Sequence, residues 1–280
     1  MKNSLIIYIS LIFIVMMPFA GKSFTVKLKG ENPEYKSYKL SFYRYSDLLS
    51  MTEIKLTECV TDTAGKFECQ IEIPATCQVF VYLGYYKGIF FAEPKKTYEL
   101  VFPPIKEKTL VDELNPFFTE EEIGIGIKNS KENELNYLIS RFNSIYETFL
   151  ADNFNYLYVY ADVKMVDSLI QKINIEFGQN KNQFFQDYVT YKLNYLRHFA
   201  YDRDRNFATK KYFAHKPVLY QNPGYMEFLN QLWGKYFTYL AINDKIGERL
   251  ISNIVYSKSP YELNKTMSLN LALRDDTLRE

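Results

Sequence analysis

Hydrophobic and polar residues alternate between residues 24 and 104, and the pattern then changes to a helical period. In Phe24-Thr-Val-Lys-Leu-Lys-Gly30 polar and apolar residues alternate, as expected for a strand with one buried face. Turn residues such as Asp62-Thr-Ala-Gly65 and Pro74 separate further short segments of this kind. The predicted strands are 24–30, 38–43, 54–60, 66–73, 77–82, 88–91 and 98–102. Their number and spacing predict an antiparallel β-sandwich over residues 24–104.

From residue 132 onward, apolar residues recur every three or four positions, which is the period of an amphipathic helix. Asn222-Pro223 supplies an N-cap followed by a proline at the first helical position, and Ser259-Pro-Tyr-Glu262 is a capping box that opens a last helix. The helix that Asn222 caps carries its apolar stripe over 226–240, and the other predicted helices are 135–150, 163–177, 184–199 and 246–256. Because their apolar faces need partners, we expect an α-helical bundle over residues 132–280 and an α+β fold class. The alternative is that some of these faces form a peptide groove.

Residues 105–131 show neither period and are predicted to be a linker that begins after Pro103-Pro104. Within it, we interpret Glu120-Glu-Glu122 as a solvated run of charge rather than a catalytic acid–base pair. Gly124-Ile-Gly126 lacks the third glycine and the preceding strand that a phosphate-binding loop needs.

The N-terminus has the pattern of a secretory signal peptide. A short basic segment, Met1-Lys-Asn-Ser4, precedes an apolar run that ends at Ala20 and is followed by small residues, which predicts cleavage near Ala20 or Ser23. The apolar run is shorter than the roughly 20 residues of a membrane-spanning helix. We therefore expect a signal peptide over residues 1–23, a periplasmic location and no membrane span after cleavage. An uncleaved anchor is the alternative.

Composition and motif content narrow the classes of function. The formal net charge is +1 and no cluster of Lys and Arg occurs, so we expect no nucleic-acid partner. The two histidines, His198 and His215, lack the neighbours that complete a zinc site, and no nucleophile or phosphate motif occurs. We therefore predict no catalytic residue, no cofactor and no metal. An enzyme that uses carboxylates in a cleft is a further hypothesis, supported only by Asp and Glu residues of unknown position.

Export places the three cysteines, Cys59, Cys69 and Cys77, in an oxidising compartment. They do not form a Cys-x-x-Cys motif, so the usual redox-active pattern is absent. Cys59 and Cys69 flank a predicted turn and can face each other across a hairpin. Either these two form a disulfide or the cysteines are buried free thiols, and the sequence leaves both alternatives open.

Several motifs resemble those of exported thioredoxin-like proteins. The turn Thr61-Asp-Thr-Ala-Gly-Lys-Phe67, followed by strands and then Phe91-Ala-Glu-Pro94, resembles their N-terminal β-domain. In this turn Asp62 and Gly65 suit a tight reversal, and Phe67 is expected to point into the core. The segments that look like the helical insert between this β-domain and a TlpA-like thioredoxin domain are Asp187-Tyr-Val-Thr-Tyr191, Tyr212-Phe213, 217–226 and Phe228-Leu-Asn230.

The resemblance implies a role but carries over no catalytic residue, because the family's Trp-Cys-x-x-Cys signature does not occur in the sequence. Asp275 or Asp276 caps a single helical turn that resembles the start of the family's next helix, and one turn alone is unstable. Whether Glu280 is the natural end of the protein stays open. We expect the non-catalytic front part of a thiol–disulfide oxidoreductase-like protein. It would position a C-terminal or separate thioredoxin-fold module, or present protein clients to it. The alternative is a self-sufficient extracytoplasmic protein, structural or binding a peptide or glycan.

Overall fold

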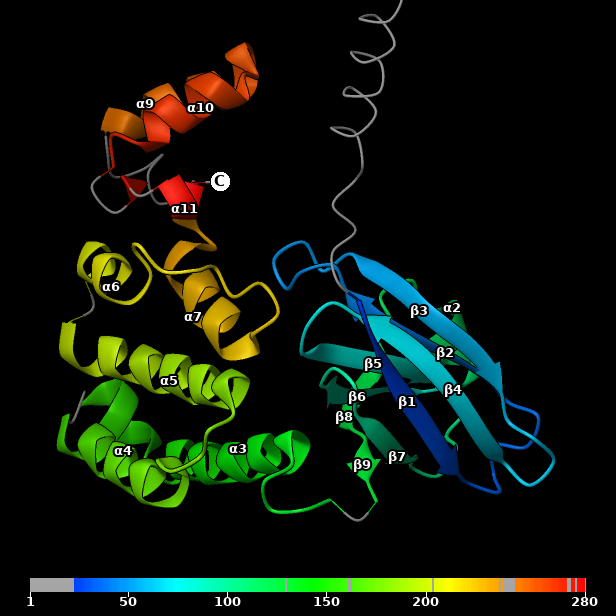
Figure 1. Ribbon diagram of the computed structural model, residues 1–280. Helices are drawn as coiled ribbons and strands as arrows, with labels where there is room; N and C mark the ends of the chain where they lie inside the picture. Colours follow the sequence, from blue (N-terminus) through cyan, green and yellow to red (C-terminus); the bar gives the residue numbers. More distant parts are fainter. Residues whose placement is uncertain are drawn as a thin grey trace, which may run out of the picture. The chain divides into compact units, whose positions relative to one another are not determined.

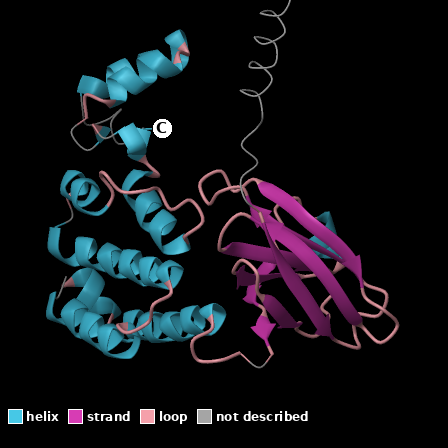
Figure 2. Cartoon of the chain, in the orientation of Figure 1, coloured by secondary structure: helices cyan, strands magenta, loops and turns pink. Residues whose placement is uncertain are grey.

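The computed structural model describes residues 23–128, 130–160, 163–202, 204–236, 238, 245–270, 273–274 and 276–279. The chain divides into two compact units (Figure 1), one comprising the described residues up to Tyr43 together with Lys55–Lys128, the other comprising Arg44–Ile54 and the described residues after 129. The first unit contains the strands and the second is helical (Figure 2). The predicted α+β class, a β-sandwich followed by helices, is confirmed. The predicted signal peptide lies outside the described residues, apart from Ser23.

The predicted strands are present with small shifts at their ends. They are β1 (Phe24–Glu31), β2 (Lys39–Tyr45), β3 (Glu53–Val60), β4 (Lys66–Ile73), β5 (Cys77–Leu83), β6 (Tyr86–Ala92) and β7 (Thr97–Val101). One sheet has the order β4-β1-β7-β9 and the other has the order β3-β2-β5-β6-β8. Both sheets are mixed, because β1 pairs with β7 in parallel and β6 pairs with β8 in parallel. The prediction of an antiparallel sandwich is therefore wrong in this respect, since the parallel pairs join strands that are distant in sequence and leave no local signal.

Residues 105–128 are not a linker but part of the sandwich unit. They contain α2 (Leu110–Leu114), β8 (Glu121–Gly124) and β9 (Gly126–Ile127). β8 continues one sheet beside β6, and β9 continues the other sheet beside β7. Between them Ile125 is buried in the sandwich core. These strands are too short to show a period in the sequence, so only their pairing with β6 and β7 identifies them.

The side chains that alternate inward from both sheets form one core, which includes Val26, Leu28, Leu40, Phe42, Ile71, Val79, Val81, Phe90, Tyr98 and Leu100. The predicted turn at Asp62–Gly65 is present at the edge of this unit. The carboxylate oxygen Oδ1 of Asp62 accepts hydrogen bonds from the amides of Ala64 and Lys66, and Gly65 has a φ of +80°. Phe67 then enters the core, where its ring stacks on that of Phe102 at 5.3 Å. The expectation for this turn is confirmed.

The helical unit contains α3 (Leu135–Asp152), α4 (Val163–Phe177), α5 (Gln183–Arg197), α6 (Arg205–Tyr212), α7 (Pro223–Trp233), α9 (Lys245–Ser252), α10 (Pro260–Met267) and the short α11 (Asp276–Arg279). π-helical turns lie at Asn155–Val159, His198–Asp202 and Asn253–Ser257. α5 contacts α3, α4 and α7, and α9 lies beside α10 (Figure 1). α7 ends at Trp233. Of the rest of the stripe predicted over 226–240, Tyr236 and Thr238 are helical, and residues 237, 239 and 240 lie outside the described residues. Asp275 lies outside the described residues.

Within the part of the chain that the structure describes, every helix is too short or too polar to cross a lipid bilayer.

Candidate functional site

The segment Arg44–Ile54 connects β2 to β3 but belongs to the helical unit. The amide of Leu48 donates to the carbonyl oxygen of Tyr220 at 2.9 Å, and the side-chain amide of Gln221 donates to the carbonyl oxygen of Ser46 at 2.6 Å. The Leu48 side chain packs on the core cluster that includes Tyr225. Two segments about 175 residues apart in sequence therefore form one surface. No local pattern predicts this pairing, because both segments are irregular.

The shape of this loop depends on the carboxylate of Asp47. Its Oδ2 accepts from the hydroxyl of Ser50 at 2.7 Å and from that of Ser46 at 2.9 Å, and its Oδ1 accepts from the amide of Leu49 at 3.0 Å. The amide of Ser50 also donates to Oδ1. These bonds favour the charged form, led by the one from the Ser50 amide, and they lower the pKa of Asp47 to about 2. The carboxylate is therefore ionised, and both of its oxygens already accept hydrogen bonds from its own loop.

Asn222, Pro223 and Gly224 fix the start of α7. The side-chain oxygen of Asn222 caps the helix by accepting from the amide of Tyr225, and its side-chain NH₂ donates to the carbonyl oxygen of Phe184 at 3.0 Å. Pro223 occupies the first helical turn, where its missing N–H costs nothing. Gly224 allows a close approach to α5, because a β-carbon there would lie 2.5 Å from the carbonyl oxygen of Tyr188. The sequence predicted the cap and the proline, and the structure adds the contact with α5.

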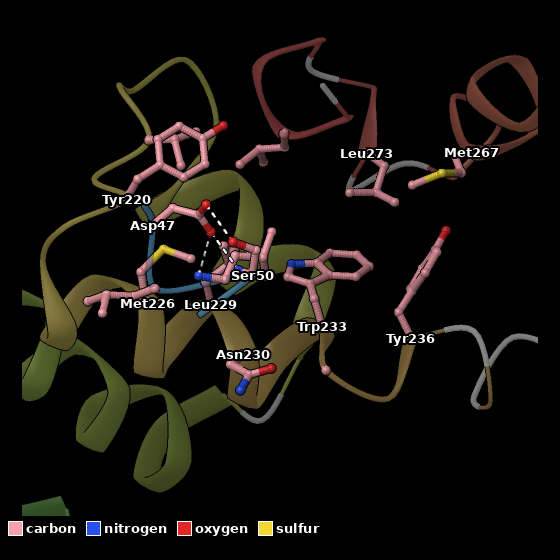
Figure 3. Close-up of a pocket in the computed structure, with 15 residues that line it drawn as sticks. Asp47, Ser50, Tyr220, Met226, Leu229, Asn230, Trp233, Tyr236, Met267 and Leu273 are labelled. Carbon is pink, nitrogen blue, oxygen red and sulfur yellow. Dashed lines mark hydrogen bonds between the residues drawn. The ribbon is translucent and has the colours of Figure 1, made fainter. Parts of the chain in front are cut away.

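A pocket of about 480 Å³ lies between this loop, α7 and the segments after α10 (Figure 3). Its volume is in the range of small-ligand sites. The pocket is lined by Asp47, Leu48, Leu49, Ser50, Val218, Tyr220, Met226, Leu229, Asn230, Trp233, Gly234, Tyr236, Met267, Leu273 and Leu278. Most of these side chains are aliphatic, aromatic or thioether groups, so the pocket is suited to an apolar group.

Trp233 is the only tryptophan of the chain and lies at the centre of this lining in Figure 3. Its ring contacts that of Tyr236 edge to face, with centroids 4.7 Å apart. The indole N–H is buried and has no hydrogen-bond partner among the described residues. A buried donor without an acceptor is unfavourable. Methionines such as Met226 and Met267 allow the lining to adapt to different shapes.

The sequence did not identify this site, because it assigned Met226, Leu229 and Trp233 to the buried face of a helix. That assignment is partly right, since Met226 is only 5 % exposed. The sequence could not show that residues on the apolar face of this helix also line a cavity. The available hint was that the single tryptophan, Trp233, belongs to this stripe.

The cysteines and histidines singled out in the sequence lie elsewhere. Cys59 and Cys69 face each other in the sandwich unit with their Sγ atoms 2.8 Å apart, while Cys77 is buried in the sandwich core. The His198 ring lies 5.8 Å from that of Phe228, and His215 is in a turn with a φ of +58°. Among the described residues no group of three or more His, Cys, Asp or Glu side chains could hold a metal ion.

Comparisons with known proteins do not assign a family. No protein-family model matches the sequence, and no curated protein is detectably similar to it. Among solved structures, the chain is similar to a 9R-lipoxygenase from Cyanothece PCC8801 with 9% sequence identity and a TM-score of 0.18. The match covers 81% of this chain and 32% of that chain, so this chain spans about a third of the lipoxygenase. A TM-score this low carries no argument about fold or function.

Proposed function

We propose that this chain is a non-catalytic client-binding module of an exported protein of the thioredoxin-like class. Its pocket would hold an apolar side chain of a protein client. The observation that carries the proposal is the 480 Å³ pocket with its largely apolar and aromatic lining. Redox chemistry would belong to a C-terminal or separate thioredoxin-fold module, and this part of the proposal rests on the resemblance of the sequence motifs alone.

The lining favours a peptide side chain over a sugar. A glycan presents many hydroxyl groups, and each one that is buried needs a polar partner. Asp47 is the only ionisable acid in the lining, and its oxygens already accept hydrogen bonds from Ser50, Ser46 and Leu49. A phenylalanine or leucine side chain needs no such partners and gains from burial against Met226 and Leu229.

Fluorescence of Trp233 tests the proposal, because this residue is the only tryptophan and lies in the lining. The full chain is titrated with a blocked pentapeptide, Gly-Gly-Phe-Gly-Gly, with its serine analogue, and with a soluble cello-oligosaccharide. We expect a saturable spectral change with the phenylalanine peptide. The serine analogue should bind at least about 10-fold more weakly, since burial of the ring contributes about 1.5–3 kcal/mol.

Two variants of α7 provide a matched pair. Leu229→Lys places a charge in the lining and should abolish the spectral change. Gln231→Lys adds the same charge at an exposed position of the same helix, outside the lining, and should leave binding unchanged. Binding of the oligosaccharide without the peptide would favour the glycan-binding alternative. Multiple-turnover insulin reduction by the chain alone would contradict a non-catalytic role.

A further inference from the structure

Cys59 and Cys69 lie where the two sheets of the sandwich unit share an edge. Cys59 is in β3, which ends one sheet, and Cys69 is in β4, which ends the other. The Asp62–Gly65 turn carries the chain from one strand to the next. The two Sγ atoms are 2.8 Å apart, and both side chains are half-buried against the sandwich core.

We propose that Cys59 and Cys69 form a dithiol–disulfide site that is oxidised by exchange with an external disulfide, and that the oxidised form joins the two sheets covalently. A disulfide needs its sulfur atoms at about 2.04 Å. From a contact of 2.8 Å, that distance is reached by a small movement of the side chains. The site is in the sandwich unit and does not involve the client pocket, whose lining is in the helical unit.

The reaction needs an external disulfide, for which glutathione disulfide is the probe. The Cys59 thiol loses its proton, and the thiolate attacks one sulfur of glutathione disulfide. The glutathione S–S bond breaks, a Cys59–glutathione mixed disulfide forms, and the released glutathione thiolate takes up a proton. Cys69 then loses its proton and attacks Sγ of Cys59, which releases the second glutathione as a thiol. In sum, the two cysteines lose two electrons and two protons, and glutathione disulfide gains them.

The thiolate is the attacking species in exchange. Either cysteine can be the entering thiol, because the two Sγ atoms are in direct contact and both side chains are half-buried. Cys77 does not compete, because it is only 1 % exposed and β2 separates its strand from β3 in the sheet order.

A thiol count on the full chain tests the proposal. The protein is equilibrated with reduced or oxidised glutathione, quenched in acid, unfolded and alkylated with N-ethylmaleimide before mass spectrometry. We expect three alkyl groups on the reduced chain and one on the oxidised chain, that one being on Cys77. Peptide mapping should show a Cys59–Cys69 bond. Three alkyl groups after oxidation, or a bond that includes Cys77, would overturn the proposal.

Two serine variants test the second step of the exchange. Cys69→Ser should trap a mixed disulfide of Cys59 with glutathione, and Cys59→Ser should trap one at Cys69, because each variant lacks the thiol that resolves it. A protein disulfide formed within the chain of either variant would overturn the pairing of Cys59 with Cys69. Leu229→Lys should not alter the thiol count, so failure of client binding and failure of this site are distinguishable.

Discussion

The backbone of Gly224 in α7 lies directly against the carbonyl oxygen of Tyr188 in α5, where a β-carbon would come within 2.5 Å of that oxygen. Real β-carbons do not approach backbone oxygens so closely. Any side chain at this position must therefore push the two helices apart. The contact lies at the start of α7, the helix that carries Met226, Leu229 and Trp233 to the pocket.

Gly224→Ala should destabilise the helical unit by about 1–3 kcal/mol, as overpacking of a tight contact does. The measurement is the free energy of unfolding from urea denaturation followed by far-UV circular dichroism. Gly124→Ala is the matched control, because a β-carbon at Gly124 has no atom within 4 Å. That control should stay within about 0.5 kcal/mol of the wild type. Equal effects of the two substitutions would contradict the close approach of α5 and α7.

Asn222→Ala should destabilise the same unit by about 2 kcal/mol. The substitution removes the cap of α7, which contributes about 1 kcal/mol, and it also removes the bond to the carbonyl oxygen of Phe184, which contributes a similar amount. Ser259→Ala is the comparison, because Ser259 caps α10 through the amide of Glu262. Its cost should be about 1 kcal/mol. If urea denaturation showed a larger loss of stability for Ser259→Ala than for Asn222→Ala, the hydrogen bond from Asn222 to Phe184 would not contribute to stability as proposed.

The loop at Asp47 should make part of the stability depend on pH. The folded pKa is about 2, below the ordinary value of 3.8, so the charged carboxylate stabilises the folded state above pH 4. This contribution is lost as the pH falls from about 4 to 2. The melting temperatures of wild type and Asp47→Asn should therefore differ at pH 6 and converge by pH 2. Differential scanning calorimetry at several pH values measures this, and a difference independent of pH would exclude the carboxylate as its cause.

Oxidation of Cys59 and Cys69 should stabilise the sandwich unit. The closed loop is short, because the cysteines are 10 residues apart, and such a loop contributes about 3 kcal/mol in the chain-entropy description. Urea denaturation with and without reductant measures the change in the free energy of unfolding. Cys59→Ser should show no dependence on the reductant. If reductant lowered the free energy of unfolding of that variant by the same amount, the stabilisation would not come from the Cys59–Cys69 disulfide.

Local signals in the sequence were sufficient for the regular elements. Alternation at Val26 and Leu28 located β1, and the stripe through Phe142 and Tyr146 located α3. The Asn222-Pro223 cap located the start of α7 within one residue. In each case the residues that determine the element are neighbours in the sequence. Residue propensities and the hydrophobic period are therefore sufficient to predict these elements.

Features that depend on distant partners were not predictable. β9 has only two residues and exists because Leu100 and Ile127 pair. α6 was missed because its cap, Asp204, stands in a charged segment without a stripe. The pocket depends on Leu48 and Tyr220, whose hydrogen bond joins the β2–β3 connection to the helical unit. The sequence of neither segment contains a pattern that predicts its contact with the other.

The β2–β3 connection has a consequence for how the chain matures on the ribosome. Ser46 and Leu48 are synthesised early, together with the strands around them. Their partners, Tyr220 and Gln221, emerge only after α3, α4, α5 and α6 have been made. At a typical rate of about 5–20 residues per second, this delay is on the order of ten seconds. During that time the side chain of Leu48 lacks the core cluster on which it packs in the folded helical unit, so a chaperone that holds nascent apolar segments would act there.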